Sequence, residues 1–178
     1  MAIILDGTNG VTTNSGTLIS ATTIGVGGAT PSTSGAGITF PATASASSDA
    51  NTLDDYEEGT WTPTVTPSSG SLTSYTSSGV YVKVGRSVTI TGAFALTNAG
   101  TASGSVLVGG IPFSGTKPST AFRTAMGSGR EDGATGVFYQ AALGGSTNEI
   151  LLQTAAGVNI TWTTGYDYVW TVTYQTSA

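Results

Sequence analysis

The alternation of side chains from Val88 to Thr97 constrains this chain more than any other feature of its sequence. In the run "VTITGAFALT" every second residue is apolar or glycine, and the residues between them are threonine or alanine. Side chains on a β-strand alternate between the two faces of a sheet, so the run predicts a strand with one buried and one open face. We expect Val88, Ile90 and Phe94 to point into a core.

The same period recurs elsewhere after Trp61. The last segment, "GYDYVWTVTYQTSA", places five large side chains on one side of a strand: Tyr166, Tyr168, Trp170, Val172 and Tyr174. Such a row could stack on sugar rings, but on a strand of a small sandwich it is more often core. Gly85 turns the preceding segment "VYVKV" back into the run described above, as a hairpin. We therefore expect an all-β fold, an antiparallel, jelly-roll-like β-sandwich.

Residues 1–55 differ in composition from the rest of the chain. They contain one aromatic residue, Phe40, and no Lys or Arg, whereas residues 56–178 contain every Trp and Tyr and all five basic residues. Their short apolar segments lie between glycine-containing breaks, and Asn9-Gly10 favours a small hairpin, which is marginal alone in water. We predict two domains, an extended N-terminal arm or stalk over residues 1–55 and a β-sandwich knob over 56–178.

The apolar residues of the arm have no core of their own. They need a surface to lie on, which could be the C-terminal domain, another copy of the chain or a larger assembly. The predicted anchoring and intersubunit residues are Ile3, Ile4, Leu5, Ile24, Val26, Ile38 and Phe40.

Charge and composition exclude several classes of function. The net charge of −5 is not accompanied by a basic stripe, so we expect no nucleic-acid partner. The apolar start "MAIIL" is too short for a signal sequence or a membrane span, and we expect no membrane partner. The chain has no Cys and no His, which removes thiolate metal sites and the usual general base. We predict no catalytic residue, no metal, no cofactor and no enzymatic activity.

Two clusters of charged residues remain as contact candidates. The run "LDDYEE" supplies the carboxylates of Asp54, Asp55, Glu57 and Glu58. Its polarity favours a solvated acidic turn, which a Lys or Arg of a neighbouring subunit could meet, over the buried acid pair of a glycosidase. The glycine-flanked loop of residues 127–136 is expected to be an exposed contact loop through Arg130, Glu131 and Asp132.

One part of the sequence also resembles a known family. The runs "GITFPATASASSDANTLDDYEEGTWTPTVT" and "SYTSSGVYVKVGRSVTITGAFALTNAGTASGSVLVGGIPF" resemble tailed-phage virion proteins, in particular tail-fibre and fibre-like proteins of phages that infect cyanobacteria and other aquatic bacteria. The resemblance covers about residues 37–113. It implies a homotrimer in which a glycine-rich stalk leads into a C-terminal β-sandwich, with the acidic hinge as the collar between them.

The expected function is that of a non-enzymatic virion structural protein, assembled in the host cytoplasm. The leading hypothesis is a short trimeric tail-fibre-like appendage whose distal β-domain recognises a glycan or protein of the host surface. The chain is shorter than a typical tail fibre, so the alternative is a capsid decoration protein, a cement protein or head fibre, anchored to other virion proteins by its arm. A carboxylate-based glycan depolymerase is the second alternative, although an extended groove and paired buried acids are not evident in the sequence.

Overall fold

A computed structural model describes residues 23–49, 51–117 and 125–177. The chain divides into two compact units, Met1–Ser45 and Ala46–Ala178. The second unit, here called the β-domain, begins earlier than the predicted boundary at residue 56. The reason is that the hinge is bonded into it: the backbone N–H of Ser47 donates to the carboxylate of Asp54 at 2.7 Å, and Asp55 forms an ion pair with Lys83.

The described part of the first unit contains two short strands, β1 (Thr23–Gly25) and β2 (Gly37–Thr39). They pair in parallel, with Ile24 opposite Ile38. A further backbone hydrogen bond of 3.0 Å runs from the N–H of Val26 to the carbonyl of Thr39. The two isoleucines remain open to solvent, because a two-stranded sheet this short has nothing to bury them against.

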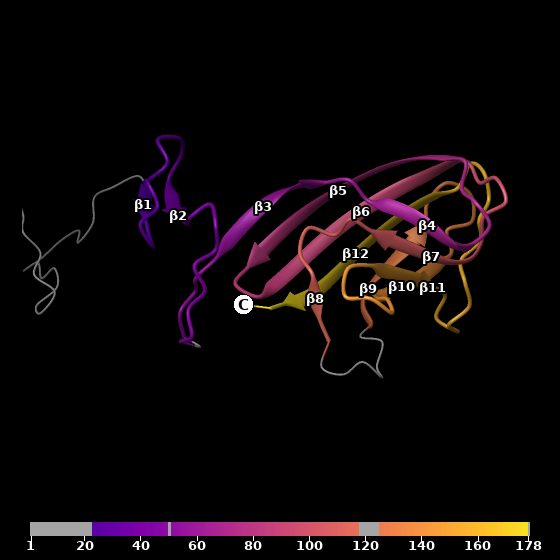
Figure 1. Ribbon diagram of the computed structural model, residues 1–178. Coiled ribbons are helices and arrows are strands. Elements are labelled where there is room, and N and C mark those ends of the chain that lie inside the picture. Colours follow the sequence, from indigo (N-terminus) through magenta and orange to yellow (C-terminus); the bar gives the residue numbers. More distant parts are fainter. Residues whose placement is uncertain (1–22, 50, 118–124, 178) are drawn as a thin grey trace, which may run out of the picture. The chain divides into compact units, whose positions relative to one another are not determined.

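The β-domain is all-β, as expected, and its described residues contain no helix. Its strands are β3 (Tyr56–Trp61), β4 (Thr64–Ser69), β5 (Ser74–Val84), β6 (Ser87–Asn98), β7 (Ser103–Gly109), β8 (Gly115–Thr116), β9 (Ala125–Glu131), β10 (Phe138–Leu143), β11 (Ile150–Gln153) and β12 (Asp167–Thr176). Figure 1 shows β5, β6 and β12 as long neighbouring strands and β9, β10 and β11 as shorter ones.

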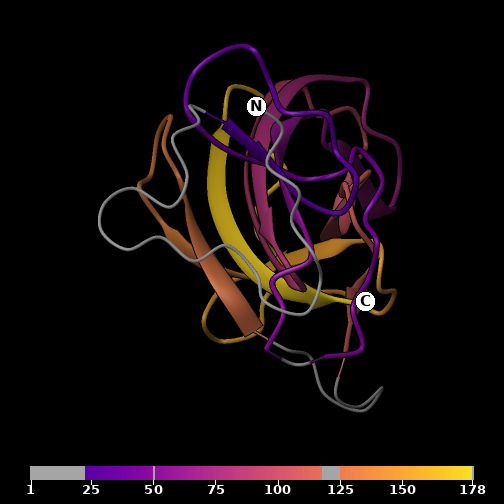
Figure 2. The same ribbon diagram turned by 90° about the vertical axis from the view of Figure 1, so that its left-hand side faces the viewer.

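These strands form one curled antiparallel sheet in the order β3-β5-β6-β12-β9-β10-β11-β7-β4, with β8 paired to β12. Figure 2 shows β12 as an arched strand with β6 beside it. The two ends of this order, β3 and β4, are consecutive in the sequence and are joined only through Thr62 and Pro63. The chain therefore passes directly from one edge of the sheet to the other, and the curled sheet encloses a sandwich-like core.

The core contains the residues that the period of two predicts. Val88, Ile90 and Phe94 of β6 are buried, while Thr89 and Thr91 between them are exposed. The predicted hairpin between β5 and β6 is present, with Gly85 at a positive φ of 54° in its turn. On β12 the large side chains are also buried: Tyr168, Trp170, Val172 and Tyr174 lie in the core, and Tyr166 packs against it.

One cross-strand row at the centre of this core consists of tryptophan and glycine. Trp61 of β3 is opposite Gly79 of β5, Gly79 is opposite Gly92 of β6, and Gly92 is opposite Trp170 of β12. The two indole rings meet edge to face, with centroids 5.8 Å apart and planes at 72°. A Cβ added to Gly79 would lie 2.2 Å from Nε1 of Trp61, and one added to Gly92 would lie 2.4 Å from Cζ2 of Trp170. The glycines therefore provide the space that the indoles fill.

The hydroxyl groups of the core tyrosines are bonded to backbone carbonyls. Tyr139 donates to Val169 at 2.9 Å, Tyr174 donates to Phe113 at 2.9 Å, and Tyr168 donates to Thr161. Burial raises the pKa of all three phenols, that of Tyr174 to about 12. These hydrogen bonds remove the cost of burying a polar group, so the rings can serve as core.

The interpretation of the hinge as a solvated acidic turn is wrong for Asp55. Its side chain is buried and pairs with the equally buried Lys83 of the same chain. The ammonium also lies 5.3 Å from the ring centroid of Phe113. Burial lowers the pKa of Lys83, and the negative charge of Asp54 opposes that shift. A carboxylate can be buried here because β3 lies beside β5, an arrangement that the polarity of the local run does not indicate.

The tryptophan–glycine row predicts that alanine is worse than glycine at Gly79, contrary to the usual order of the two residues in strands. Alanine is normally no worse than glycine within a strand. We expect Gly79→Ala to destabilise the protein by about 1–3 kcal/mol, because its methyl group overpacks against the indole of Trp61. Urea unfolding followed by tryptophan fluorescence measures the change. Gly145→Ala is the control, since a Cβ at Gly145 meets no atom within 4 Å; equal stability of the two variants would contradict the packing described.

Candidate functional site

The outward face of the long strands is hollowed around Val169 of β12. Three open hollows of about 480, 330 and 280 Å³ adjoin there, and Val169 lines all of them. The largest lies over β3, β5 and β6, and the next over β5, β6 and β12. The third lies over β6, β12, β9 and β10. We call these three hollows together the outer groove.

The outer groove exists because its floor is made of small side chains. Ser78, Ala93 and Thr91 line its middle. On the neighbouring strands Thr91 and Thr171, which also line the groove, pair with hydroxyl oxygens 3.3 Å apart. The floor is therefore shallow, hydroxylated and free of charge.

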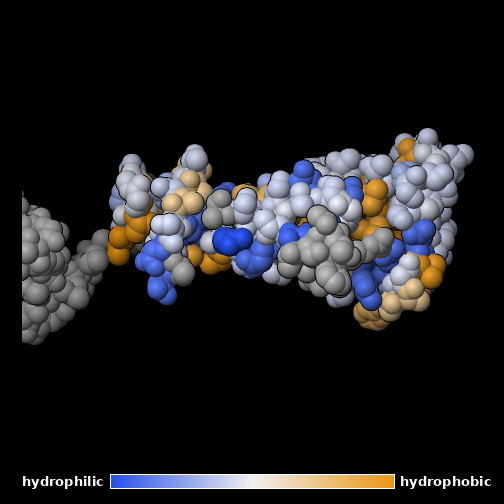
Figure 3. Space-filling model, turned by 60° about the horizontal axis from the view of Figure 1, so that its bottom comes forward, coloured by the Kyte–Doolittle hydropathy of each residue, from blue (hydrophilic) through white to orange (hydrophobic). Residues whose placement is uncertain are grey.

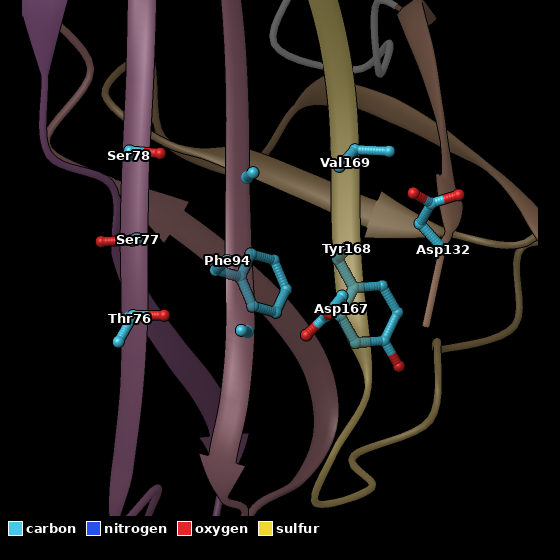
Figure 4. Close-up of a pocket in the computed structure, with 10 residues that line it drawn as sticks. Thr76, Ser77, Ser78, Phe94, Asp132, Asp167, Tyr168 and Val169 are labelled. Carbon is cyan, nitrogen blue, oxygen red and sulfur yellow. The ribbon is translucent and has the colours of Figure 1, made fainter. Parts of the chain in front are cut away.

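Carboxylates lie at one side of the 330 Å³ hollow over β5, β6 and β12. Figure 4 shows Asp132 and Asp167 on the β12 side and the side chains of Thr76 and Ser78 across from them on β5. Both carboxylates are exposed, and the guanidinium of Arg130 is 2.8 Å from Asp132. The backbone N–H of Asp132 donates to the carbonyl of Asp167 at 2.7 Å, which fixes the loop to the end of β12.

Phe138 flanks the third hollow. With 72% of its surface exposed, it is the most exposed large apolar side chain among the described residues. It is the cross-strand partner of Arg130, so an open aromatic ring and a guanidinium stand side by side at the rim. On the face of the β-domain that Figure 3 presents, apolar and hydrophilic surface alternate in small areas. An exposed phenyl ring beside a hydroxylated floor suits stacking on a flat ligand with hydrogen-bonding groups.

Of the three predicted contact-loop residues, the structure places two at the surface. Arg130 and Asp132 are exposed and ion-paired, but Glu131 is buried, so its prediction as an exposed contact residue is wrong. The period of two explains this, since residues 130 and 132 lie on the opposite side of the chain from residue 131. Glu131 instead organises the loop between β9 and β10.

The carboxylate of Glu131 accepts hydrogen bonds from the loop that follows it. The N–H groups of Gly133 and Ala134 donate to Oε1 at 2.7 and 2.8 Å, and Thr135 donates to Oε2 through its N–H and, at 2.7 Å, its hydroxyl. Gly136 adds a longer bond of 3.3 Å. Burial alone would raise the pKa of Glu131, but these hydrogen bonds outweigh it and lower the pKa to about 2.

The predicted anchoring residues have different outcomes. Ile3, Ile4 and Leu5 lie outside the described residues. Ile24 and Val26 are each 36% exposed and Ile38 is 59% exposed, so they lack cover within the described part of the chain. Phe40 is half-buried. Whether these residues contact another subunit or a virion protein stays a prediction.

Sequence reasoning did not single out Phe138 or Asp167. The segment "GVFYQAAL" contained the necessary signal for Phe138, because a strand that buries Tyr139 and Ala141 must turn Phe138 outward. For Asp167 the alternation along β12 indicated an outward side chain but not which residues lie beside it. It enters the groove only because β12 lies between β6 and β9.

Several kinds of site receive no support from the described residues. They contain no group of three or more His, Cys, Asp or Glu side chains that could hold a metal ion. No helix long and apolar enough to cross a membrane occurs among them.

Comparison of the chain with family models, with curated proteins and with solved structures finds no match of any of the three kinds.

The buried carboxylate of Glu131 generates a prediction about acid stability. Its folded-state pKa of about 2 lies below the ordinary 4.5, so its contribution is complete above about pH 4.5 and is lost as the pH falls toward 2. We expect Glu131→Gln to lower the melting temperature at pH 7 and to flatten its fall between pH 4.5 and 2. The control is Asp132→Asn, an exposed neighbour. A Glu131→Gln protein with the parent's acid profile would show that this carboxylate does not hold the loop.

Proposed function

We propose that this chain is a non-enzymatic phage virion structural protein, a short trimeric fibre-like appendage whose β-domain recognises the host surface. The observation that carries the proposal is the contrast between the two units. The β-domain has a complete core, whereas the described part of the N-terminal unit exposes Ile24 and Ile38 on a two-stranded sheet. Apolar residues left open in this way suit a segment that is covered on assembly. The resemblance over residues 37–113 supports the same assignment.

The outer groove is the surface proposed for recognition. It is broad and shallow, lies on the sheet, and combines a hydroxylated floor with the exposed ring of Phe138 and the paired charges of Arg130 and Asp132. These groups suit a glycan, because sugar rings stack on aromatic faces and sugar hydroxyls bond to carboxylates and guanidinium groups. A binding role is favoured over hydrolysis, since both aspartates of the groove are exposed and glycoside hydrolysis needs one carboxyl kept protonated.

Antibody labelling of intact virions tests the position of the protein. We expect label at the tail, as befits an appendage that meets the host. Label spread over the whole head would contradict that position and favour the decoration protein.

Binding of the purified chain to host cells tests the groove. We expect Phe138→Ala to weaken binding by about tenfold, the effect of removing one well-placed aromatic contact. Val158→Ala is the matched control, because Val158 is also an exposed apolar residue, at 60%, but does not line the groove. Equal weakening by the two substitutions would argue against recognition through the groove.

A further inference from the structure

The outward face of β5 changes character along the strand. In its first half the exposed side chains are the polar Ser74, Thr76 and Ser78, and the last two line the outer groove. In its second half they are Val80, Val82 and Val84, which are 54%, 41% and 45% exposed. Tyr56, opposite Val84 on β3, is 42% exposed on the same face. We call Val80, Val82, Val84 and Tyr56 the valine stripe.

The usual distribution of apolar and charged residues is reversed at the stripe. Lys83, between two of the valines, points inward and pairs with Asp55, while the valines point to solvent. A strand of a monomeric domain normally places its lysine outward and its valines inward. Here the lysine is neutralised inside the domain, which leaves the outer face of this part of β5 without charge.

The borders of the stripe carry few charged groups. On the β3 side the ionisable neighbour is Glu58, whose carboxylate accepts a hydrogen bond of 2.7 Å from the hydroxyl of Tyr56. On the β6 side the partners of the valines are Ser87, Thr89 and Thr91. Arg86 lies in the adjoining turn, with its Nε donating to the carbonyl of Thr176 at 3.0 Å. A surface of this kind can meet a copy of itself with little electrostatic repulsion.

We infer that the valine stripe is a contact between neighbouring copies of this chain, in which the stripes of adjacent β-domains pack together. The inference rests on the proposed trimeric appendage. Four half-exposed side chains form much less than the roughly 800 Å² per partner of a stable interface, so the stripe acts together with the arm. Tyr56 of the stripe directly follows the hinge, so the stripe lies at the end of the β-domain that the chain enters from the arm.

The proposed contact and the proposed recognition site occupy largely different parts of the outer face. Figure 1 shows β3 lying along the half of β5 that ends at the β5–β6 turn, and the valine stripe occupies this half. The groove extends from the other half of β5 across β12 to Phe138 and Arg130 on β9 and β10. Val80 also lines the largest hollow, so packing of the stripes covers that edge of the groove and leaves the two hollows along β12 open.

Sedimentation velocity on the full chain over a range of concentrations tests the inference. We expect the parent protein to self-associate and Val82→Glu to weaken that association by about tenfold or more, because a carboxylate replaces a buried methyl pair. Thr66→Glu is the matched control, a β-branched residue exposed on β4 that belongs to neither the stripe nor the groove. Near-ultraviolet circular dichroism confirms that each variant is folded.

The absence of cysteine from the sequence permits a second, more direct measurement. With a mild oxidant, Val82→Cys should give a disulfide-linked dimer of chains at low protein concentration, and Thr66→Cys should not. If the parent and Val82→Glu associate to the same extent and Val82→Cys gives no cross-link, the stripe contact is overturned. That result would not contradict the trimeric appendage. A parent protein that stays monomeric would overturn the appendage as well.

Discussion

The packing of two indole rings against two glycines holds the curled sheet together. Trp61 comes from the edge strand β3 and Trp170 from β12, and the rings meet over Gly79 and Gly92 of the strands between them. Large rings opposite glycine bring their bulk inside the sheet without pushing the strands apart. The sheet can curve around its core here because Gly79 and Gly92 leave free the space that the two indole rings occupy.

Local pattern predicted much of the β-domain. Alternation along β6 and β12 identified the buried faces correctly, because these strands lie in the middle of a sheet with one face on the core. The hairpin at Gly85 was also predicted, since its turn is local. The order of the other strands was not, because the pairing of β7 with β4 and of β12 with β9 joins segments far apart in the sequence.

Charged residues were the least predictable part of the chain. Asp55 and Glu131 both stand in polar runs that suggest solvent, and both are buried. Their burial is explained by partners that sequence spacing does not reveal, namely Lys83 on a neighbouring strand and the N–H groups of a loop folded back on its own carboxylate. The candidate site was predicted only at Arg130 and Asp132, because the groove arises from six strands brought together by the fold.

The direct passage from β3 to β4 has a mechanical consequence. A pull along the axis of β3 would load its hydrogen bonds to β5 and, through Thr62 and Pro63, those of β4 to β7. Hydrogen bonds loaded along the strand direction share a force, whereas those at the end of a hairpin pulled apart sideways break one after another. A pull in that direction is therefore resisted by shear, with the load divided between the two edges of the sheet.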